Sequence, residues 1–167
     1  MLRLLLPIIL VIAAVAADVP DARAQTNGSG LPLPRFVSLR ASEVNMRTGP
    51  GVQYPVEWVY RRQALPVEVV AEYGTWRKVR DWQGTQGWVH QSMLSGRRAM
   101  IVTGKVRSLR SRPQVESAPV AKLEPGVIGR LMSCPQDGAW CRIEVAGRAG
   151  WLRRVEFWGA YRSEALE

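Results

Sequence analysis

The sequence contains little of the chemistry on which most enzymes depend. Its 167 residues include a single histidine, His90, and two cysteines, Cys134 and Cys141. A structural zinc site takes four Cys or His ligands, and a thiol nucleophile needs a neighbouring base. The sequence also has no HExxH motif, no Ser-containing nucleophile elbow and no Gly-rich phosphate loop. We therefore expect no catalytic residues, no metal site, no cofactor and no enzymatic activity.

Only one long apolar run occurs, at the amino end of the chain. Residues 4–17 (LLLPIILVIAAVAA) follow Arg3, and residues 22–24 (ARA) provide a small-x-small cleavage site. This layout is typical of a secretory signal. A retained anchor is the alternative, but fourteen residues with a proline are fewer than the roughly 20 that span a bilayer. We expect residues 1–24 to be a cleaved signal peptide, the protein to be periplasmic or secreted, and no transmembrane segment to follow.

Acidic residues are outnumbered, so the chain carries a formal net charge of +9, and 20 of its 23 basic residues are arginines. Basic proteins often bind nucleic acid through its phosphates. An exported protein meets little nucleic acid, so we predict none as a partner. Cell-wall carboxylates, anionic lipid head groups and acidic proteins are the polyanions it would meet. The other interpretation is that the charge serves only solubility, and the sequence leaves both open.

Helical periodicity is missing after residue 34, and short strands separated by turn residues are predicted instead. The strand pattern occurs twice, at a spacing of 61–64 residues. Corresponding segments include VNMRTGP (44–50) and RSLRSRP (107–113), WRKV (76–79) and WCRI (140–143), and GWV (87–89) and GWL (150–152). Such a repeat predicts two copies of one structural unit.

The repeat divides the chain into two small domains, at about 35–100 and 101–162, with a short tail at 163–167. Residues 25–34 (QTNGSGLPLP) precede them and are expected to form a flexible linker. About 60 residues cannot make a large sandwich, but they can close a small, strongly curved barrel without exposed edges. The predicted fold class is therefore all-β, with two tandem small barrels. Residues 100–104 (MIVTG) are alternatively the first strand of the second barrel, which would make the domains abut.

The first repeat resembles a known family. The string VNMRTGPGVQYPV, followed by TWRKV and GWV, is similar to the bacterial SH3-like (SH3b) domain, in which an N-x-R-x-G-P segment precedes a GWV strand. The second repeat departs from this pattern, because Ser108 and Arg112 replace the asparagine and the glycine. The resemblance covers nearly all of the mature chain. It implies SH3-like barrels that bind cell-wall material or another envelope protein, and not catalysis.

The two cysteines flank Asp137-Gly138, a strong signal for a two-residue hairpin turn. With these as the central residues, Cys134 faces Cys141. Opposed Cα atoms lie roughly 4.5–5.5 Å apart, which suits a disulfide. This register places the cysteines at a hydrogen-bonded pair, where bridges are more strained. We predict a structural disulfide, and the alternative is a redox-active or metal-binding pair, although no C-x-x-C motif is present.

Seven tryptophans, against two phenylalanines, provide the strongest functional signal. Strand alternation places four of them on outward faces together with basic residues. Hairpin pairing then makes Trp76 a neighbour of Trp88, and Trp140 a neighbour of Trp151. An outward tryptophan pair bordered by arginines suits a sugar or peptide ligand. The alternative is that the loop at 47–54 folds over this face and turns the tryptophans into a second small core.

Four further side chains are candidate ligand contacts. Tyr54 precedes a predicted strand, and Trp58 lies on it, at a position that suits either the core or the surface. Trp82 lies in an Asp-Trp-Gln-Gly turn and is expected to be the most exposed tryptophan. Arg47, like Arg110 in the second repeat, either braces the following loop by hydrogen bonds to carbonyls or recognises a ligand carboxylate.

Two functions fit these observations. The first is a non-enzymatic envelope module that binds peptidoglycan or its stem peptides through the tryptophan–arginine faces. The second is a scaffold or accessory protein that docks another envelope protein through the same faces. The sequence alone does not separate them.

Overall fold

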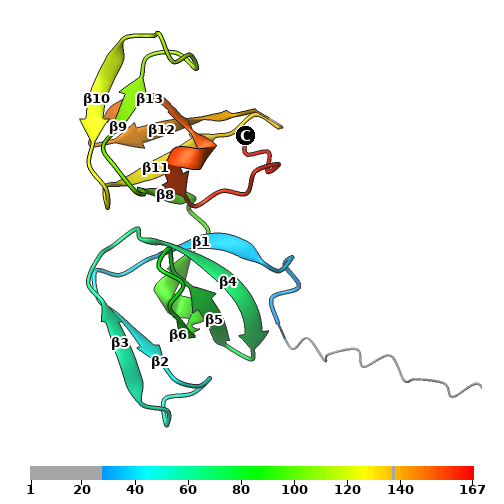
Figure 1. Ribbon diagram of the computed structural model, residues 1–167. Coiled ribbons are helices and arrows are strands. Elements are labelled where there is room, and N and C mark those ends of the chain that lie inside the picture. Colours follow the sequence, from blue (N-terminus) through cyan, green and yellow to red (C-terminus); the bar gives the residue numbers. More distant parts are fainter. Residues whose placement is uncertain (1–27, 137) are drawn as a thin grey trace, which may run out of the picture.

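The structure of the chain, a computed structural model, describes residues 28–136 and 138–167 (Figure 1). The predicted signal peptide and Asp137 of the predicted turn lie outside the described residues. The regular structure of the described ranges is β-strand, apart from two short 3-10 helices, η1 (Gln91–Met93) and η2 (Arg154–Glu156). No helix within those ranges is long and apolar enough to cross a membrane. The predicted all-β fold class is confirmed.

The first domain is a seven-stranded antiparallel sheet in the order β3-β2-β6-β5-β4-β1-β7. Its strands are β1 (Arg35–Leu39), β2 (Val44–Arg47), β3 (Val56–Tyr60), β4 (Pro66–Tyr73), β5 (Trp76–Arg80), β6 (Gln86–His90) and β7 (Leu94–Ser95).

The second domain is another seven-stranded antiparallel sheet, in the order β10-β9-β13-β12-β11-β8-β14. Its strands are β8 (Ala99–Val102), β9 (Arg107–Arg110), β10 (Pro119–Leu123), β11 (Ile128–Ser133), β12 (Trp140–Val145), β13 (Arg148–Arg153) and β14 (Phe157–Trp158). Each strand occupies the place of its counterpart in the first sheet, and the registers agree: Arg47 lies opposite Trp88, and Arg110 opposite Trp151. The predicted tandem repeat is therefore confirmed.

The sheets are not closed into the barrels that we expected. Within the described residues, β3 and β7 are the edges of the first sheet, and β10 and β14 are the edges of the second. β7 and β14 are only two residues long. Register shifts in the β4–β5 and β11–β12 pairs mark irregularities of the kind that bend a strand. Each sheet is thus bent at these irregularities and open at its two edges.

Each domain has its own hydrophobic core, formed by the inward positions of alternating strands. Val79 of β5 and Val89 of β6 are fully buried in the first core, and Ile143 of β12 and Leu152 of β13 are fully buried in the second. The residues between them face the other side of each sheet. The alternation predicted from the sequence is therefore present on these strands.

β8 lies against both cores. Its four residues are all buried. Met100 and Val102 belong to the second core, while Ile101, on the opposite face of the strand, belongs to the first. The expected domain boundary at residues 100 and 101 falls inside this strand, and the two domains abut.

Strands β1 and β8 lie at the junction between the domains (Figure 1), and aromatic side chains pack at this junction. The ring of Phe36 packs edge-on against Trp158 at 4.8 Å between centroids and lies 4.7 Å from Tyr161. The guanidinium of Arg98 lies over the same ring, 5.6 Å from its centroid. The Tyr161 hydroxyl donates a 2.7 Å hydrogen bond to Glu68 of β4. These contacts pack the two domains into one unit.

Glu72 of β4 holds the segment that precedes β1. Its carboxylate accepts hydrogen bonds from the Ser29 backbone N–H (2.6 Å) and hydroxyl (2.8 Å), and it pairs with Arg35 (2.5 Å) and Arg77 (3.0 Å). Burial would raise the pKa of Glu72, but the hydrogen bonds from Arg35 and Ser29 outweigh it and lower the pKa to about 2. Residues 28–34, expected to belong to a flexible linker, are therefore fastened to the sheet at Ser29.

The predicted disulfide between Cys134 and Cys141 is present, with 4.4 Å between the Cα atoms. The turn that joins them differs from the prediction, because the Gly138 N–H donates to the Pro135 carbonyl (3.1 Å). The Cys134 N–H and carbonyl bond to Leu166 (2.7 and 2.9 Å) and not to β12. The cysteines thus form a non-hydrogen-bonded pair, whereas we expected a hydrogen-bonded one. A register shift near the end of β11 accounts for the difference.

Candidate functional site

The tryptophans expected to pair across each hairpin are diagonal neighbours. In the β5–β6 pair, Trp76 lies opposite His90, and Trp88 lies opposite Lys78. The Trp76 ring is edge-on to the His90 ring, with 5.4 Å between centroids. The β12–β13 pair repeats the arrangement, with Trp140 opposite Arg153 and Trp151 opposite Arg142. Each tryptophan thus faces a basic side chain or histidine across the ladder, and diagonal positions lie about 7–8 Å apart.

These four tryptophans are half-buried and lie outside both hydrophobic cores of the described residues. They therefore keep part of their ring surface available. They are available as the aromatic part of a binding face.

Arg47 and Arg110 occupy the bracing position that was one of the two alternatives for them. Arg47 Nη1 donates to the carbonyls of Val52 (3.1 Å) and Tyr54 (2.7 Å). Arg110 Nη1 donates to the carbonyl of Ser117 (2.9 Å). Each guanidinium thereby fixes the loop that follows its strand.

The loop of the first domain is folded compactly on itself. A Cβ at Gly49 would lie 2.4 Å from the Tyr54 ring, so only glycine allows this ring to pack where it does. Tyr54 still exposes 40% of its surface, and Trp58 on the edge strand β3 exposes 54%. Trp58 is therefore a surface residue and the most exposed tryptophan of the described residues.

Trp82, which we expected to be the most exposed, is half-buried and packs against the first core. The reason lies in its turn. The buried Asp81 carboxylate accepts hydrogen bonds from two backbone N–H groups of the turn, both 2.9 Å, and from the Tyr60 hydroxyl at 3.1 Å. Burial and the neighbouring Asp81 raise the pKa of Tyr60 well above its usual range. This anchored turn holds Trp82 against the sheet.

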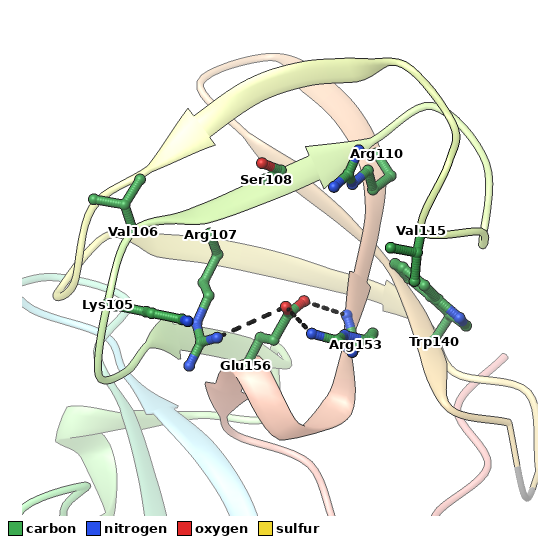
Figure 2. Close-up of a pocket in the computed structure, with 9 residues that line it drawn as sticks. All are labelled: Lys105, Val106, Arg107, Ser108, Arg110, Val115, Trp140, Arg153 and Glu156. Carbon is green, nitrogen blue, oxygen red and sulfur yellow. Dashed lines mark hydrogen bonds and ion pairs between the residues drawn. The ribbon is translucent and has the colours of Figure 1, made fainter.

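The second domain contains a pocket of about 170 Å³ next to Trp140 (Figure 2). Trp140, Val106 and Val115 supply apolar wall, and Ser108 and Arg110 come from β9. The sequence had singled out Trp140 and Arg110. The pocket adds four charged residues that it had not: Lys105, Arg107, Arg153 and Glu156.

Glu156 is the acidic residue of the pocket, and its carboxylate lies between two arginines (Figure 2). Its Oε1 is 2.8 Å from Arg153 Nη2 and 3.8 Å from Arg107 Nη1, and its Oε2 accepts the Arg153 backbone N–H at 3.0 Å. The hydrogen bond and the charge of Glu156 raise the pKa of Arg153. Four cations (Lys105, Arg107, Arg110, Arg153) against one anion give the lining a formal charge of +3.

The first domain keeps Arg47 at the position of Arg110 but lacks the other charged residues of this pocket. The matched registers of the two sheets align the positions. Arg107, Arg153 and Glu156 stand where the first domain has Val44, His90 and Met93. Aligning the repeats position by position is the sequence signal that could have revealed these three residues.

His90, the single histidine, caps η1 in the first domain. Its Nδ1 accepts the Ser92 backbone N–H at 3.3 Å and lies 2.7 Å from the Ser92 hydroxyl. No group of three or more His, Cys, Asp or Glu side chains that could hold a metal occurs among residues 28–136 and 138–167. The arrangement around His90 serves the helix cap.

A larger groove, of about 1250 Å³, is lined by residues of both domains. Arg40 and Arg97 line it from the first domain and the connection, and Arg130 lines it from β11. None of these three arginines forms an ion pair with another residue that the structure describes. The groove is broad, polar and positively charged.

Comparison with known proteins agrees with the repeat. The bacterial SH3 domain family matches the chain twice, over residues 40–96 and 104–159. No curated protein matches it. Two solved structures are similar, NlpC1 from Trichomonas vaginalis (12% identity, TM-score 0.35, 78% of this chain) and NlpC2 from the same organism (10%, 0.35, 76%). The alignment spans 48% of the length of each of these two proteins. Because the family matches cover more than half of the residues, this chain belongs to the bacterial SH3 domain family.

Proposed function

We propose that this chain is a non-enzymatic binding module of the cell envelope, periplasmic or secreted, that recognises peptidoglycan or its stem peptides through its tryptophan–arginine faces. Membership of the bacterial SH3 domain family supports an association with the cell wall. The observation that carries the proposal is the pocket beside Trp140, where an aromatic ring and several arginines converge on one small space.

The chemistry of the faces suits this class of ligand. Sugar rings and small aliphatic side chains pack on aromatic surfaces, and peptide carboxylates pair with guanidinium groups. Trp140 lies opposite Arg153, and Trp151 opposite Arg142. A wall fragment that carries both apolar surface and carboxylates finds complementary groups at both kinds of position.

The disulfide supports the location. A bond between Cys134 and Cys141 persists in an oxidising compartment such as the periplasm or the extracellular space. The described residues contain no free cysteine. The peptidoglycan of the cell wall is accessible from the same side.

The proposal is tested by retention of the purified protein on peptidoglycan sacculi at low and high salt. We expect salt-sensitive retention, because added ions screen exposed arginine contacts. Trp140→Ala should weaken retention, and Trp76→Ala/Trp88→Ala reports the share of the first domain. Arg148→Gln, an exposed substitution outside the pocket, is the matched control. Absence of retention of the folded wild-type protein would contradict the proposal.

A second function is favoured by one specific observation, an exposed apolar row on the edge strand β3 and the loop that precedes it. Val52, Tyr54, Val56 and Trp58 expose 76%, 40%, 43% and 54% of their surfaces. Edge strands with exposed apolar side chains are sites where a partner protein can add a strand. A scaffold that docks an envelope protein would use this row. Trp58→Ala should then abolish co-purification of one stoichiometric partner and leave retention on sacculi unchanged.

A further inference from the structure

We propose that the pocket of the second domain binds the terminal carboxylate of a short peptide, with the adjoining side chain against Trp140 and Val115. This inference deepens the proposed function, and it rests on that function for the source of the peptide.

The pocket has hydrogen-bond donors to spare for an anion. The Arg107 side chain makes a long hydrogen bond, 3.5 Å from Nη2 to the Thr103 carbonyl, and its Nη1 lies 3.8 Å from Glu156, beyond hydrogen-bond distance. Lys105 forms no ion pair within the described ranges. A guanidinium carries five N–H donors and matches a carboxylate in two-point geometry. Arg107 and Lys105 are therefore available to receive a carboxylate.

Glu156 does not prevent Arg107 and Lys105 from binding an anion. Its carboxylate is already bound on both oxygens by Arg153, through the guanidinium and the backbone N–H. It lies 3.8 Å from Arg107, a loose pair that leaves most of that guanidinium free. Glu156 holds Arg153 in place, and the lining keeps its formal charge of +3.

The two ends of the pocket are lined by different residues. Lys105, Arg107 and Val106 lie at one end, Val115, Trp140 and Arg110 lie at the other, and Glu156 and Arg153 lie between them (Figure 2). A ligand that presents a carboxylate to the first end places its neighbouring atoms against the second. This arrangement fits a carboxylate attached to a small apolar residue.

The size of the pocket limits the ligand to the end of a chain. Its volume is about 170 Å³. Sites that enclose whole drug-sized molecules have about 300–1,000 Å³. The pocket therefore accommodates one terminal residue, and the rest of the peptide extends over the surface.

The counterpart in the first domain cannot make this contact, because Val44 replaces Arg107 and Ser42 replaces Lys105. Val44 is buried in the first core. The two domains therefore differ in ligand, and anion recognition is assigned to the second, which departs more from the family pattern.

The experiment titrates the purified protein with N-acetyl-Ala-Ala, in its L,L and D,D forms, against the matching C-terminal amide. NMR follows the indole resonance of Trp140, assigned with Trp140→Phe. We expect at least one acid form to bind about tenfold more tightly than its amide. Arg107→Gln should weaken binding of that acid about tenfold and Lys105→Gln about threefold, whereas Lys122→Gln, an exposed lysine outside the pocket, should change nothing.

The inference would be overturned if the acid and the amide bound equally, or if neither perturbed the Trp140 resonance. It would also be overturned if N-acetyl-Ala-Asp-Ala-amide, which carries only a side-chain carboxylate, bound as tightly as the acid, because that result would indicate an acidic protein as the partner. Arg107→Gln tests binding only if its NMR spectrum shows that the domain is folded. If Arg107→Gln does not fold, Lys105→Gln, which changes an exposed residue, tests the same contact. Retention on sacculi is measured separately. If the protein is retained on sacculi but binds acid and amide equally, the assignment of the pocket is wrong and the proposed function stands. If it prefers the acid but is not retained on sacculi, the assignment of the pocket stands and the proposed function is wrong.

Discussion

The hydroxyl of Tyr161, in the second domain, donates a 2.7 Å hydrogen bond to the carboxylate of Glu68, in the first. Glu68 is almost completely buried and also accepts two hydrogen bonds from Arg80, at 2.8 and 2.5 Å. Burial and the bond to Glu68 raise the pKa of Tyr161 well above its usual range, so the hydroxyl keeps its proton through neutral and mildly alkaline pH. The two domains are thus joined by a polar contact as well as by aromatic packing.

Replacement of this hydroxyl tests how strongly the domains support each other. Tyr161→Phe keeps the ring beside Phe36 and removes one charge-assisted hydrogen bond, so we expect a loss of about 1–2 kcal/mol in the free energy of unfolding. Urea denaturation measures the loss. Tyr73→Phe, at an exposed tyrosine, is the control. A loss no larger than that of the control would show that the contact does not stabilise the pair of domains.

Arg154 connects the disulfide turn to the carboxyl-terminal segment. Its buried guanidinium donates to four carbonyls, those of Gly138 (2.6 Å), Pro135 (2.8 Å), Tyr161 (2.6 Å) and Glu164 (2.7 Å). Arg154→Lys keeps the charge but cannot reach all four acceptors.

We expect Arg154→Lys to cost about 2–4 kcal/mol, measured by urea denaturation, because buried carbonyls lose their donor. Arg162→Lys, at an exposed arginine, should be neutral. Equal stability of the two variants would mean that the four bonds contribute little net free energy.

The ion cluster at Glu72 predicts a dependence of stability on pH. The pKa of Glu72 is about 2 in the folded protein, below the value of about 4.3 for a free glutamate. Its contribution to stability is therefore complete above about pH 4.5 and is lost as the pH falls towards 2. Glu72→Gln should cost about 2–3 kcal/mol at pH 7 and progressively less below pH 4.

Urea denaturation of wild type and Glu72→Gln at pH 7, 5 and 3 measures this convergence. Glu57→Gln, at an exposed glutamate with no ion pair among the described residues, is the control and should run parallel to wild type. If the free energy of unfolding of Glu72→Gln also ran parallel to that of wild type across this pH range, Glu72 would not be the titrating group.

Loss of the disulfide should destabilise the second domain. The bond closes a loop of eight residues, which corresponds to about 2–3 kcal/mol by loop entropy. We expect Cys134→Ala/Cys141→Ala to show this loss, and the wild-type protein to show a similar one in the presence of a reductant. Differential scanning calorimetry measures both. If reduction left the melting temperature unchanged, the bond would not contribute to stability.

The periodicity of the sequence was sufficient to predict the architecture. Alternation of apolar residues, the 61–64-residue repeat and the turn signals indicated two small all-β domains, and the structure has two sheets of identical strand order. The pairing of Cys134 with Cys141 was predicted from a hairpin turn centred on Asp137-Gly138, and the disulfide is present. The turn itself differs from the prediction, because the partner of the Cys134 backbone is Leu166, more than thirty residues further along the chain.

The pocket was harder to predict because its charged residues come from two separated segments. Lys105 and Arg107 lie at the start of the second repeat, and Arg153 and Glu156 lie near its end. Individually these residues are ordinary surface charges in a basic protein. The register of β9, β13 and β12 is what places these charged residues around Trp140. Trp82 was misjudged for a similar reason, since a turn position says nothing about the buried aspartate that anchors the turn.

β8 has a consequence for how this protein can be dissected. Ile101 belongs to the first core, while Met100 and Val102 belong to the second. Truncation at the boundary therefore removes a core side chain from one of the two domains and leaves a cavity there. A first domain ending before residue 99 would expose apolar surface to water, and a second domain beginning there would carry Ile101 uncovered. Function should therefore be apportioned by single substitutions in the intact chain, since separated halves would report on damaged folds.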